Sequence, residues 1–324
     1  MEQRSCYLPE GSLLHSPQNY AALSTEEGLR AAMESGQRLE ARVRVCDSGH
    51  NLHVDLPCMR GMIPRTEGAI GISEGVTRDI ALISRVNKPV CFSVLRIARD
   101  PDGTPYAVLS RRMQQEHCRD GYLSHLQPGD VIPACVTHLA PFGCFVDIGC
   151  GVPSLIPIDA ISVSRISHPA DRFRVGQEIR VMVKGFENGR VLLTHKELLG
   201  TWMENAACFS AGETVAGIVR SVEDYGIFIE LAPNLAGLAD LRADVVPGQH
   251  ASVYIKSIVP DRMKIKLAIV DVFDEAAPAA PPPMKYFFTG DHMDEWIYTP
   301  PQAKRRIASR FTENRMQDQH AGAE

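Results

Sequence analysis

Hydrophobic and polar residues alternate with a period of two along many short segments of this chain, which is the pattern of half-buried β-strands. The pattern is clearest between residues 127 and 195. There it predicts five strands, over residues 131–139, 143–148, 154–157, 178–186 and 190–194. The Asn188-Gly189 pair between the last two strands is a strong hairpin signal. We therefore expect a small β-structure with a long connection between its third and fourth strands.

A second segment repeats the first at a constant offset of 83 residues, the distance from Phe142 to Tyr225 (225 − 142 = 83). Over this repeat, Phe142-Gly143-Cys144-Phe145 matches Tyr225-Gly226-Ile227-Phe228 without a gap. A repeat of domain size predicts two copies of one fold, over residues 127–195 and 210–270. Five strands with one long connection favour a Greek-key barrel of the OB type.

The rest of the chain completes an all-β architecture of tandem five-stranded OB-fold barrels joined by short helices. Residues 36–112 carry β-type segments on both sides of a connection at 66–86, and predict a degenerate barrel. Ser24 and Glu27 form a capping-box pattern that predicts a helix from Ser24. The other predicted segments are an N-terminal arm and helix at 1–35, linker helices at 113–126 and 196–209, an Ala/Pro-rich linker at 271–283, and a tail at 284–324 with an aromatic cluster and a helix from Pro301.

Strand alternation predicts which side chains of the repeat leave the barrel core. In the second strand, Cys144, Val146 and Ile148 share one face, and Phe145 lies on the other face. The apolar trio must face the core, because a slip of one residue would bury the neighbouring carboxylate of Asp147 instead. Phe145 and its copy then point outward. Two exposed aromatic rings on a barrel form a stacking platform for bases, worth ~1–3 kcal/mol per base.

The same alternation places cations beside each aromatic pair. Lys184 and Arg190 point outward in the first copy, and Lys256, Lys264 and Lys266 point outward in the second. Ammonium and guanidinium groups in these positions suit the phosphates of a nucleic-acid strand. An alternative is structural: the rings would cover a barrel end or pack on the linker helix at 196–209.

Charge and cysteine content limit the classes of function. The net charge of −5 excludes a strongly basic nucleic-acid binder, so local cations and aromatic surfaces would have to carry any RNA binding. Only residues 36–112 are clearly positive, with twelve basic and eight acidic side chains (12 − 8 = +4). Nine cysteines without a Cys-x-x-Cys pair indicate reduced thiols rather than a zinc site. The absence of a long apolar run or signal peptide predicts a cytoplasmic protein without a membrane segment.

Both copies resemble the S-one repeat, the RNA-binding unit of the large bacterial small-subunit ribosomal protein. The residues that carry the resemblance are Gly129-Asp130-Val131, Phe142 to Ile148, Ser154 to Ile158, Val175 to Glu178 and Gly189-Arg190-Val191 in the first copy, and Tyr225 to Phe228 and Leu235 to Leu238 in the second. The resemblance implies an OB fold that binds single-stranded RNA through two aromatics, a histidine in the third strand and a polar pair near the fourth and fifth strands.

Carried over to this chain, the resemblance gives a set of candidate site residues. They are Phe142, Phe145, Lys184, Glu187 and Arg190 in the first copy, and Tyr225, Phe228, Lys256 and Lys264 in the second. Pro157 and Asp240 stand where the family has its histidine, and Val259 stands at the acidic position of the second copy. Asp240 and Glu230 add negative charge, so we expect weaker binding there. Residues 48–52 replace the aromatics in the degenerate barrel.

The leading functional hypothesis is a monomeric RNA-binding protein that holds single-stranded mRNA near the small ribosomal subunit during translation. No catalytic constellation, metal cluster or cofactor motif stands out, and His292 between Asp291 and Asp294 is interpreted as a solvated group. Two alternatives remain open. One is a regulator of RNA stability or transcription, and the other is an adaptor whose barrels and aromatics bind protein. The degenerate barrel would dock to ribosomal RNA or protein, or serve as a structural repeat.

Overall fold

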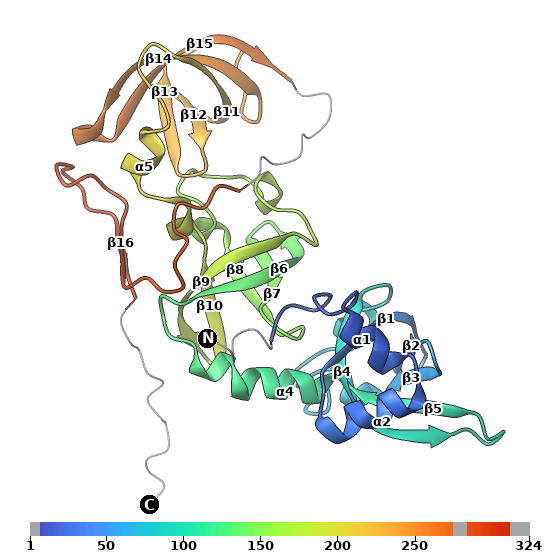
Figure 1. The fold of residues 1–324 in the computed structure, drawn as a ribbon. Coiled ribbons are helices and arrows are strands. Elements are labelled where there is room, and N and C mark those ends of the chain that lie inside the picture. Colours follow the sequence, from blue (N-terminus) through green and yellow to red (C-terminus); the bar gives the residue numbers. More distant parts are fainter. Residues whose placement is uncertain (1–6, 275–283, 312–324) are drawn as a thin grey trace, which may run out of the picture. The chain divides into compact units, whose positions relative to one another are not determined.

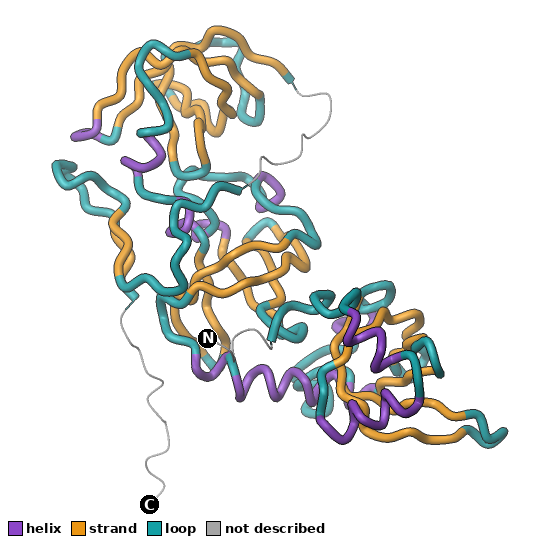
Figure 2. The backbone as a smooth tube through the Cα atoms, in the orientation of Figure 1, coloured by secondary structure: helices purple, strands orange, loops and turns teal. Residues whose placement is uncertain are grey.

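Three closed five-stranded barrels form the framework of the protein in a computed structural model that describes residues 7–274 and 284–311 (Figure 1). This confirms the prediction of tandem OB-type barrels. The chain divides into two compact units. The N-terminal unit contains residues up to 126 together with 147–153, and the C-terminal unit contains 127–146 and the residues from 154 onward. Strands dominate the regular structure and the helices are short (Figure 2).

The first barrel lies in the N-terminal unit and has the strand order β1-β2-β3-β5-β4. Its strands are β1 (Leu39–Cys46), β2 (Leu52–Asp55), β3 (Arg60–Ile63), β4 (Pro89–Arg99) and β5 (Pro105–Ser110). Only β3 and β5 pair in parallel, and antiparallel pairing of β4 with β1 closes the barrel. The long connection between β3 and β4 holds a 3₁₀ helix (Arg65–Glu67) and the single-turn helix α3 (Ile80–Ile83).

Two helices precede this barrel, where the sequence predicted one helix from Ser24. Helix α1 (Pro17–Leu23) starts at Ser16, whose side chain accepts from the backbone N–H of Asn19, with proline at the first helical position. Ser24 is the C-cap of α1 rather than an N-cap. Helix α2 (Glu26–Ser35) begins instead at Thr25, because Thr25 is extended and its Oγ1 accepts from Gly28 N–H at 2.9 Å.

Helix α4 (Arg111–Gly121) follows β5 and is succeeded by a 3₁₀ turn (Leu123–His125). Arg111 on α4 is 3% exposed, and its guanidinium donates to the Glu10 carboxylate at 2.6 and 3.0 Å and to Gly151 O at 3.3 Å. The ion pair raises the pKa of Arg111 despite its burial. A charge buried at this depth needs such partners to remain ionised. Arg111 therefore fixes the arm and the 147–153 turn inside the N-terminal unit.

Asp147, predicted to lie on the outer face of its strand, is only 4% exposed. Its carboxylate accepts from the backbone N–H groups of Glu10 at 2.7 Å, Gly149 at 2.8 Å and Gly151 at 3.0 Å. Burial and the nearby Glu10 carboxylate raise the pKa of Asp147 to about 7. The alternation correctly turned this side chain away from the barrel core. It could not show that a segment 137 residues earlier would cover it.

The second barrel has the strand order β10-β8-β7-β6-β9. Its strands are β6 (Val131–Ala140), β7 (Gly143–Asp147), β8 (Pro153–Pro157), β9 (Glu178–Glu187) and β10 (Arg190–Thr194). Leu155 and Leu192 are partners in the parallel β8–β10 pair, and β9 pairs antiparallel with both β6 and β10. Two 3₁₀ turns, Ile158–Ala160 and Pro169–Asp171, lie in the long β8–β9 connection.

The third barrel repeats this topology in the order β11-β12-β13-β15-β14. Its strands are β11 (Thr214–Glu223), β12 (Gly226–Ala232), β13 (Leu235–Ala239), β14 (His250–Val259) and β15 (Lys264–Phe273), with a 3₁₀ turn at Pro260–Arg262. Strand β15 continues beyond the predicted end of the domain at 270. A 3₁₀ helix (Lys196–Leu199) and helix α5 (Trp202–Ala206) form the linker, and a capping box between Thr201 and Glu204 starts α5.

The tail forms a two-stranded sheet, and the helix predicted from Pro301 is absent from the described residues. Strands β16 (Glu295–Ile297) and β17 (Ala308–Arg310) pair antiparallel. Glu295 accepts from Arg306 and Arg310, which favours the hairpin over a helix after the Pro300-Pro301 pair. The predicted aromatic cluster packs into the C-terminal unit, where Trp296 and Tyr298 are buried. Residues 275–283 and 312–324, parts of the predicted linker and tail, lie outside the described residues.

Within the ranges that the structure describes, no helix combines the length and the apolar character needed to cross a membrane. The same ranges contain no group of three or more His, Cys, Asp or Glu side chains arranged to hold a metal ion.

Candidate nucleic-acid interface

A glycine begins the aromatic strand of both repeats because the next strand lies too close for a side chain. A Cβ on Gly143 would lie 2.5 Å from Ile156 O, and a Cβ on Gly226 would lie 2.7 Å from Ala239 O. Gly226 also has φ +148°, a conformation that residues with a Cβ rarely adopt. The glycine therefore lets β7 approach β8, and β12 approach β13, at the point where the first aromatic of each pair emerges.

The two aromatic pairs have the same geometry. Phe142 is 58% exposed and Phe145 is half-buried, with ring centroids 5.9 Å apart and planes at 87°. Tyr225 is 70% exposed and Phe228 is half-buried, at 6.0 Å and 88°. The alternate residues Cys144, Val146, Ile227 and Ile229 are fully buried in the barrel cores. The predicted outward orientation is therefore observed in both barrels, and the first ring of each pair is largely exposed to solvent.

One part of the structural alternative for these rings, packing against Trp202 of the linker, is not observed in the part of the chain that is described. Trp202 is 2% exposed and packs in the apolar cluster formed by the third barrel and the tail. That cluster contains neither Phe142 nor Phe145. The backbone N–H of Trp202 donates to Tyr298 O, which ties the linker to the tail. The first aromatic pair thus remains available to a partner.

His138 joins the first aromatic pair and was missed by the sequence pattern. Its exposed ring lies 6.0 Å from the ring of Phe145 at an angle of 36°. Strict alternation from the buried Val136 would turn His138 inward. In the third barrel, however, a register shift in β11 places Ser221 opposite Phe228, and 138 + 83 = 221. A bulge of this kind cannot be seen in the hydrophobic pattern.

The predicted polar residues of the second barrel gather on β9 and β10. Glu187 and Arg190 are partners at the start of the β9–β10 hairpin, and both are exposed. Lys184 is exposed and is the extra residue at a register shift opposite Leu192 and Leu193. Among the described residues, neither Lys184 nor Arg190 has an ion-pair partner. Both cations can therefore bind a phosphate without first breaking a salt bridge.

The cations of the third barrel are less available than predicted. Lys256 donates to Asp240 at 2.9 Å, so Asp240 neutralises it in place. Lys264 and Lys266 are exposed. Lys266 is the parallel partner of Leu238, which in turn pairs with Phe228. Lys266 therefore lies on the strand row that contains the aromatic pair, and we add it to the candidate residues.

Glu230 was expected to place a negative charge near a phosphate path, and this expectation is wrong. Its side chain is 5% exposed and accepts from Arg172 Nη2 at 2.5 Å and from Arg220 Nε at 2.7 Å. Arg220 also pairs with Asp171 at 3.2 Å. Burial lowers the pKa of Arg172, an effect that Glu230 opposes. The four charges of this cluster sum to zero. Of Glu230 and Asp240, only Asp240 therefore has a carboxylate at the surface.

The first barrel has no aromatic pair in the corresponding place. Asp47 there closes the β1–β2 turn by accepting from the N–H groups of Gly49 and Asn51 and from His53. Several of the cations behind its +4 charge are already paired with carboxylates: Arg44 with Asp55, Arg60 with Asp100, Arg65 with Asp79, and Arg112 with Glu67. This barrel lacks the stacking surface of the second, so its remaining cations have no aromatic pair beside them.

Comparisons with known proteins agree with this geometry. Residues 125–196, which contain the whole second barrel, match the S1 RNA binding domain. The small ribosomal subunit protein bS1 of Staphylococcus aureus is 27% identical over 267 residues, covering 76% of this chain and 66% of its own length. The bS1 protein of Leuconostoc lactis is 31% identical over 210 residues, covering 63% of this chain and 46% of its own. The chain thus spans about half to two thirds of the length of these relatives.

A solved multidomain protein with nucleic acid binding domains, from Streptococcus pneumoniae, aligns with 72% of this chain and 73% of its own length. Its identity of 12% and TM-score of 0.23 are too low to support an argument about arrangement or function.

Proposed function

Because this chain belongs to the family of S1-domain proteins, we propose that it binds single-stranded RNA on the aromatic faces of its second and third barrels. The observation that carries the proposal is the exposed, edge-on aromatic pair that recurs with nearly identical geometry in both barrels. Bases stack on such rings largely without regard to sequence, while nearby cations hold the phosphates.

The second barrel is the main site in this proposal. It combines Phe142 and Phe145 with the additional ring of His138 and with the unpaired cations Lys184 and Arg190. The third barrel offers a second, weaker site, because the ammonium of Lys256 is already paired with the Asp240 carboxylate. Two modest sites on one chain bind a single strand more tightly than either alone, since binding at one raises the effective concentration at the other.

We further propose that the RNA is mRNA held near the small ribosomal subunit during translation, in a cytoplasmic protein that acts as a monomer without enzymatic activity. Support comes from the similarity over most of the chain to bS1 proteins, which are components of the small subunit by name. Crosslinking in cells, followed by sequencing of the bound RNA, tests this part. We expect mRNA leaders and small-subunit rRNA. Recovery of neither class would reject the ribosomal role and favour an adaptor.

RNA binding itself is tested with the full chain carrying Phe142→Ala and Phe145→Ala together. Loss of one stacked base costs ~1–3 kcal/mol, so affinity for a single-stranded oligonucleotide should fall about tenfold or more. Tyr20→Ala is the matched control, because Tyr20 on α1 is a 66% exposed aromatic outside the barrels. Normal affinity in the double variant would overturn the stacking proposal.

The cations are tested through salt. Replacing Lys184 or Arg190 with Gln should weaken binding evenly across sequences and reduce the slope of log affinity against log salt by ~1 for each phosphate that is no longer neutralised. An unchanged slope would show that these side chains do not touch the backbone of the RNA.

A further inference from the structure

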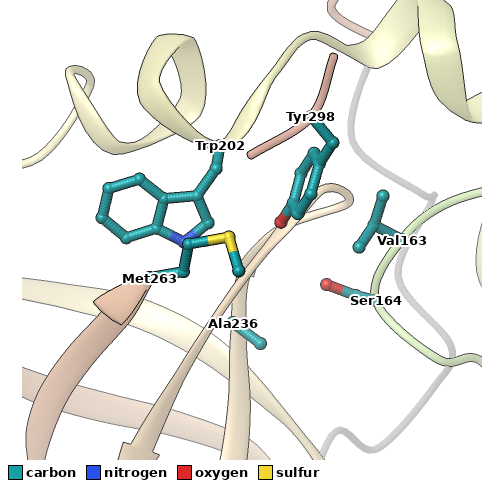
Figure 3. A pocket seen from close by; sticks show the side chains of 6 residues that line it. All are labelled: Val163, Ser164, Trp202, Ala236, Met263 and Tyr298. Carbon is teal, nitrogen blue, oxygen red and sulfur yellow. The ribbon is translucent and has the colours of Figure 1, made fainter. Parts of the chain in front are cut away.

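A cavity of about 180 Å³ lies in the C-terminal unit beside the third barrel (Figure 3). Its walls come from four separate segments of the chain: the β8–β9 connection, α5, the third barrel and the tail. The lining residues are Val163, Ser164, Trp202, Ala236, Met263 and Tyr298. The indole of Trp202 and the ring of Tyr298 stand on either side of the space, with Met263 beside the indole (Figure 3).

The cavity adjoins the aromatic face of the third barrel. Ala236 on β13 precedes Leu238 by two residues, and Leu238 pairs with both Phe228 and Lys266. Two residues along a strand span about 7 Å. Lys266 lies beside Leu238, and the same parallel register continued by two residues would bring Lys264 beside Ala236. A strand of RNA that stacks on Phe228 and follows these lysines therefore reaches the cavity within about one nucleotide.

The lining suits an uncharged aromatic ring. Tyr298 donates its hydroxyl to Asn234 O at 2.7 Å, and burial raises its pKa, so this wall stays neutral. Ser164 is buried, and its hydroxyl donates to Ala232 O at 3.4 Å, which leaves its oxygen able to accept a hydrogen bond. The exposed Lys264 follows Met263 directly, where a phosphate attached to the ring would lie. A cavity of about 150 Å³ holds benzene, so one of this size takes a ring as large as a pyrimidine.

We propose that this cavity binds one pyrimidine base of the single-stranded RNA that stacks on Tyr225 and Phe228. The inference rests on the proposed function and adds to it a base-selective subsite. The aromatic platform accepts any base, whereas the volume of the cavity limits the size of the ring that it can hold. The linker and the tail, which lie outside the barrels, thereby become part of the RNA site.

Filling the cavity tests the inference. Ala236→Leu places a larger side chain inside it, and Ala268→Leu makes the same change at a half-buried position of β15 that does not line it. We expect Ala236→Leu to weaken binding of an oligouridylate about tenfold, and binding of an oligoadenylate of equal length much less. Ala268→Leu should bind both like the unmodified protein. Equal affinity of Ala236→Leu and Ala268→Leu for oligouridylate would overturn the inference.

Two further measurements separate this result from failure of the proposed function or of folding. The double variant Tyr225→Ala with Phe228→Ala should weaken the binding of both oligonucleotides equally. If this double variant binds them normally, the stacking platform is rejected, and Ala236→Leu still tests the cavity. Photocrosslinking of 4-thiouridine RNA should label the peptide containing Tyr298 in the unmodified protein and lose that label in Ala236→Leu. Labelling of Tyr298 that persists in Ala236→Leu would place the base elsewhere and reject the inference.

Discussion

Replacement of Glu230 by Gln should destabilise the third barrel strongly, although Glu230 belongs to neither the core nor the RNA face. The carboxylate is the shared partner of Arg172 and Arg220, whose side chains are 4% and 11% exposed. Gln keeps the shape of the side chain and removes its charge. Arg220 would retain Asp171, but Arg172 has no second carboxylate among the ion pairs of the described residues.

The magnitude follows from leaving Arg172 buried and unpaired. Breaking a buried ion pair by removing one partner costs about 3–5 kcal/mol, because the remaining charge is kept out of water. Arg172 Nε already lacks a hydrogen-bond partner in the described part of the chain, so little compensation is available. A loss of this size corresponds to a roughly 10²- to 10⁴-fold increase in the population of the opened barrel.

Hydrogen exchange on the full chain can measure this change locally. Amides in β11 to β13 should lose protection by that factor, while amides in β1 to β5 of the N-terminal unit should keep theirs. Glu223→Gln is the matched control, because Glu223 is an exposed glutamate at the end of β11. Its effect should stay within about 0.5 kcal/mol.

The double variant Glu230→Gln with Arg172→Met should recover much of the loss, since no unpaired guanidinium then remains buried. Less than a tenfold change in the exchange of the third barrel, or an equal loss of protection in both units, would refute the reasoning. The first outcome would mean that water reaches Arg172, and the second that the effect is not local.

Two other predictions concern a buried histidine and a buried turn. His195 is fully buried, and burial lowers its pKa to about 4, below the ~6.5 of an unfolded histidine. The unfolded state therefore binds a proton more readily, and the C-terminal unit should lose about 2 kcal/mol of its free energy of unfolding between pH 7 and 5. Denaturant titrations should show this loss, and His195→Gln should remove this part of the pH dependence. Gly151→Ala should make the N-terminal unit unfold at a lower denaturant concentration, because the new Cβ overlaps the Arg111 guanidinium. Gly176→Ala has a similar positive φ but open space around the Cβ, so it should lower the free energy of unfolding by only about 1 kcal/mol. Equal losses of stability in the two variants would contradict this prediction.

The barrels and the aromatic faces could be predicted because both depend on local alternation. The buried Cys144 and Val146 in β7, with their copies in β12, fixed which way Phe145 and Phe228 point, because the opposite register would have turned a carboxylate into the barrel core. The repeat showed the same exposed aromatic pair twice, which supports a binding role more strongly than a single motif would. Strand boundaries in the second barrel could be placed for the same reason, since Gly and Asn-Gly turns separate its alternating segments.

The remaining features depend on contacts between distant parts of the chain. Asp147 and Glu230 have the correct orientation in the alternation, yet Glu10 and Arg172 come from other segments to cover them. His138 lies against Phe145, where strict alternation would have turned it inward, and the corresponding Ser221 follows a register shift in β11. The cavity has walls from four segments that the sequence pattern does not bring together. Side-chain direction can be inferred from a strand alone, whereas burial and pairing require the whole fold.

The turn at 147–153 also bears on how this protein is made and how it can be divided. It joins two strands of the second barrel, but it completes the N-terminal unit, where Asp147 caps the arm and Gly151 O accepts from Arg111. During synthesis the contacts of Asp147 with Glu10, and of Gly151 with Arg111, can form only after the strands of the first barrel have emerged. A fragment that ends at residue 126 would leave the buried guanidinium with fewer partners. Fragments for biochemistry should therefore keep the N-terminal unit together with the whole second barrel, residues 7–196.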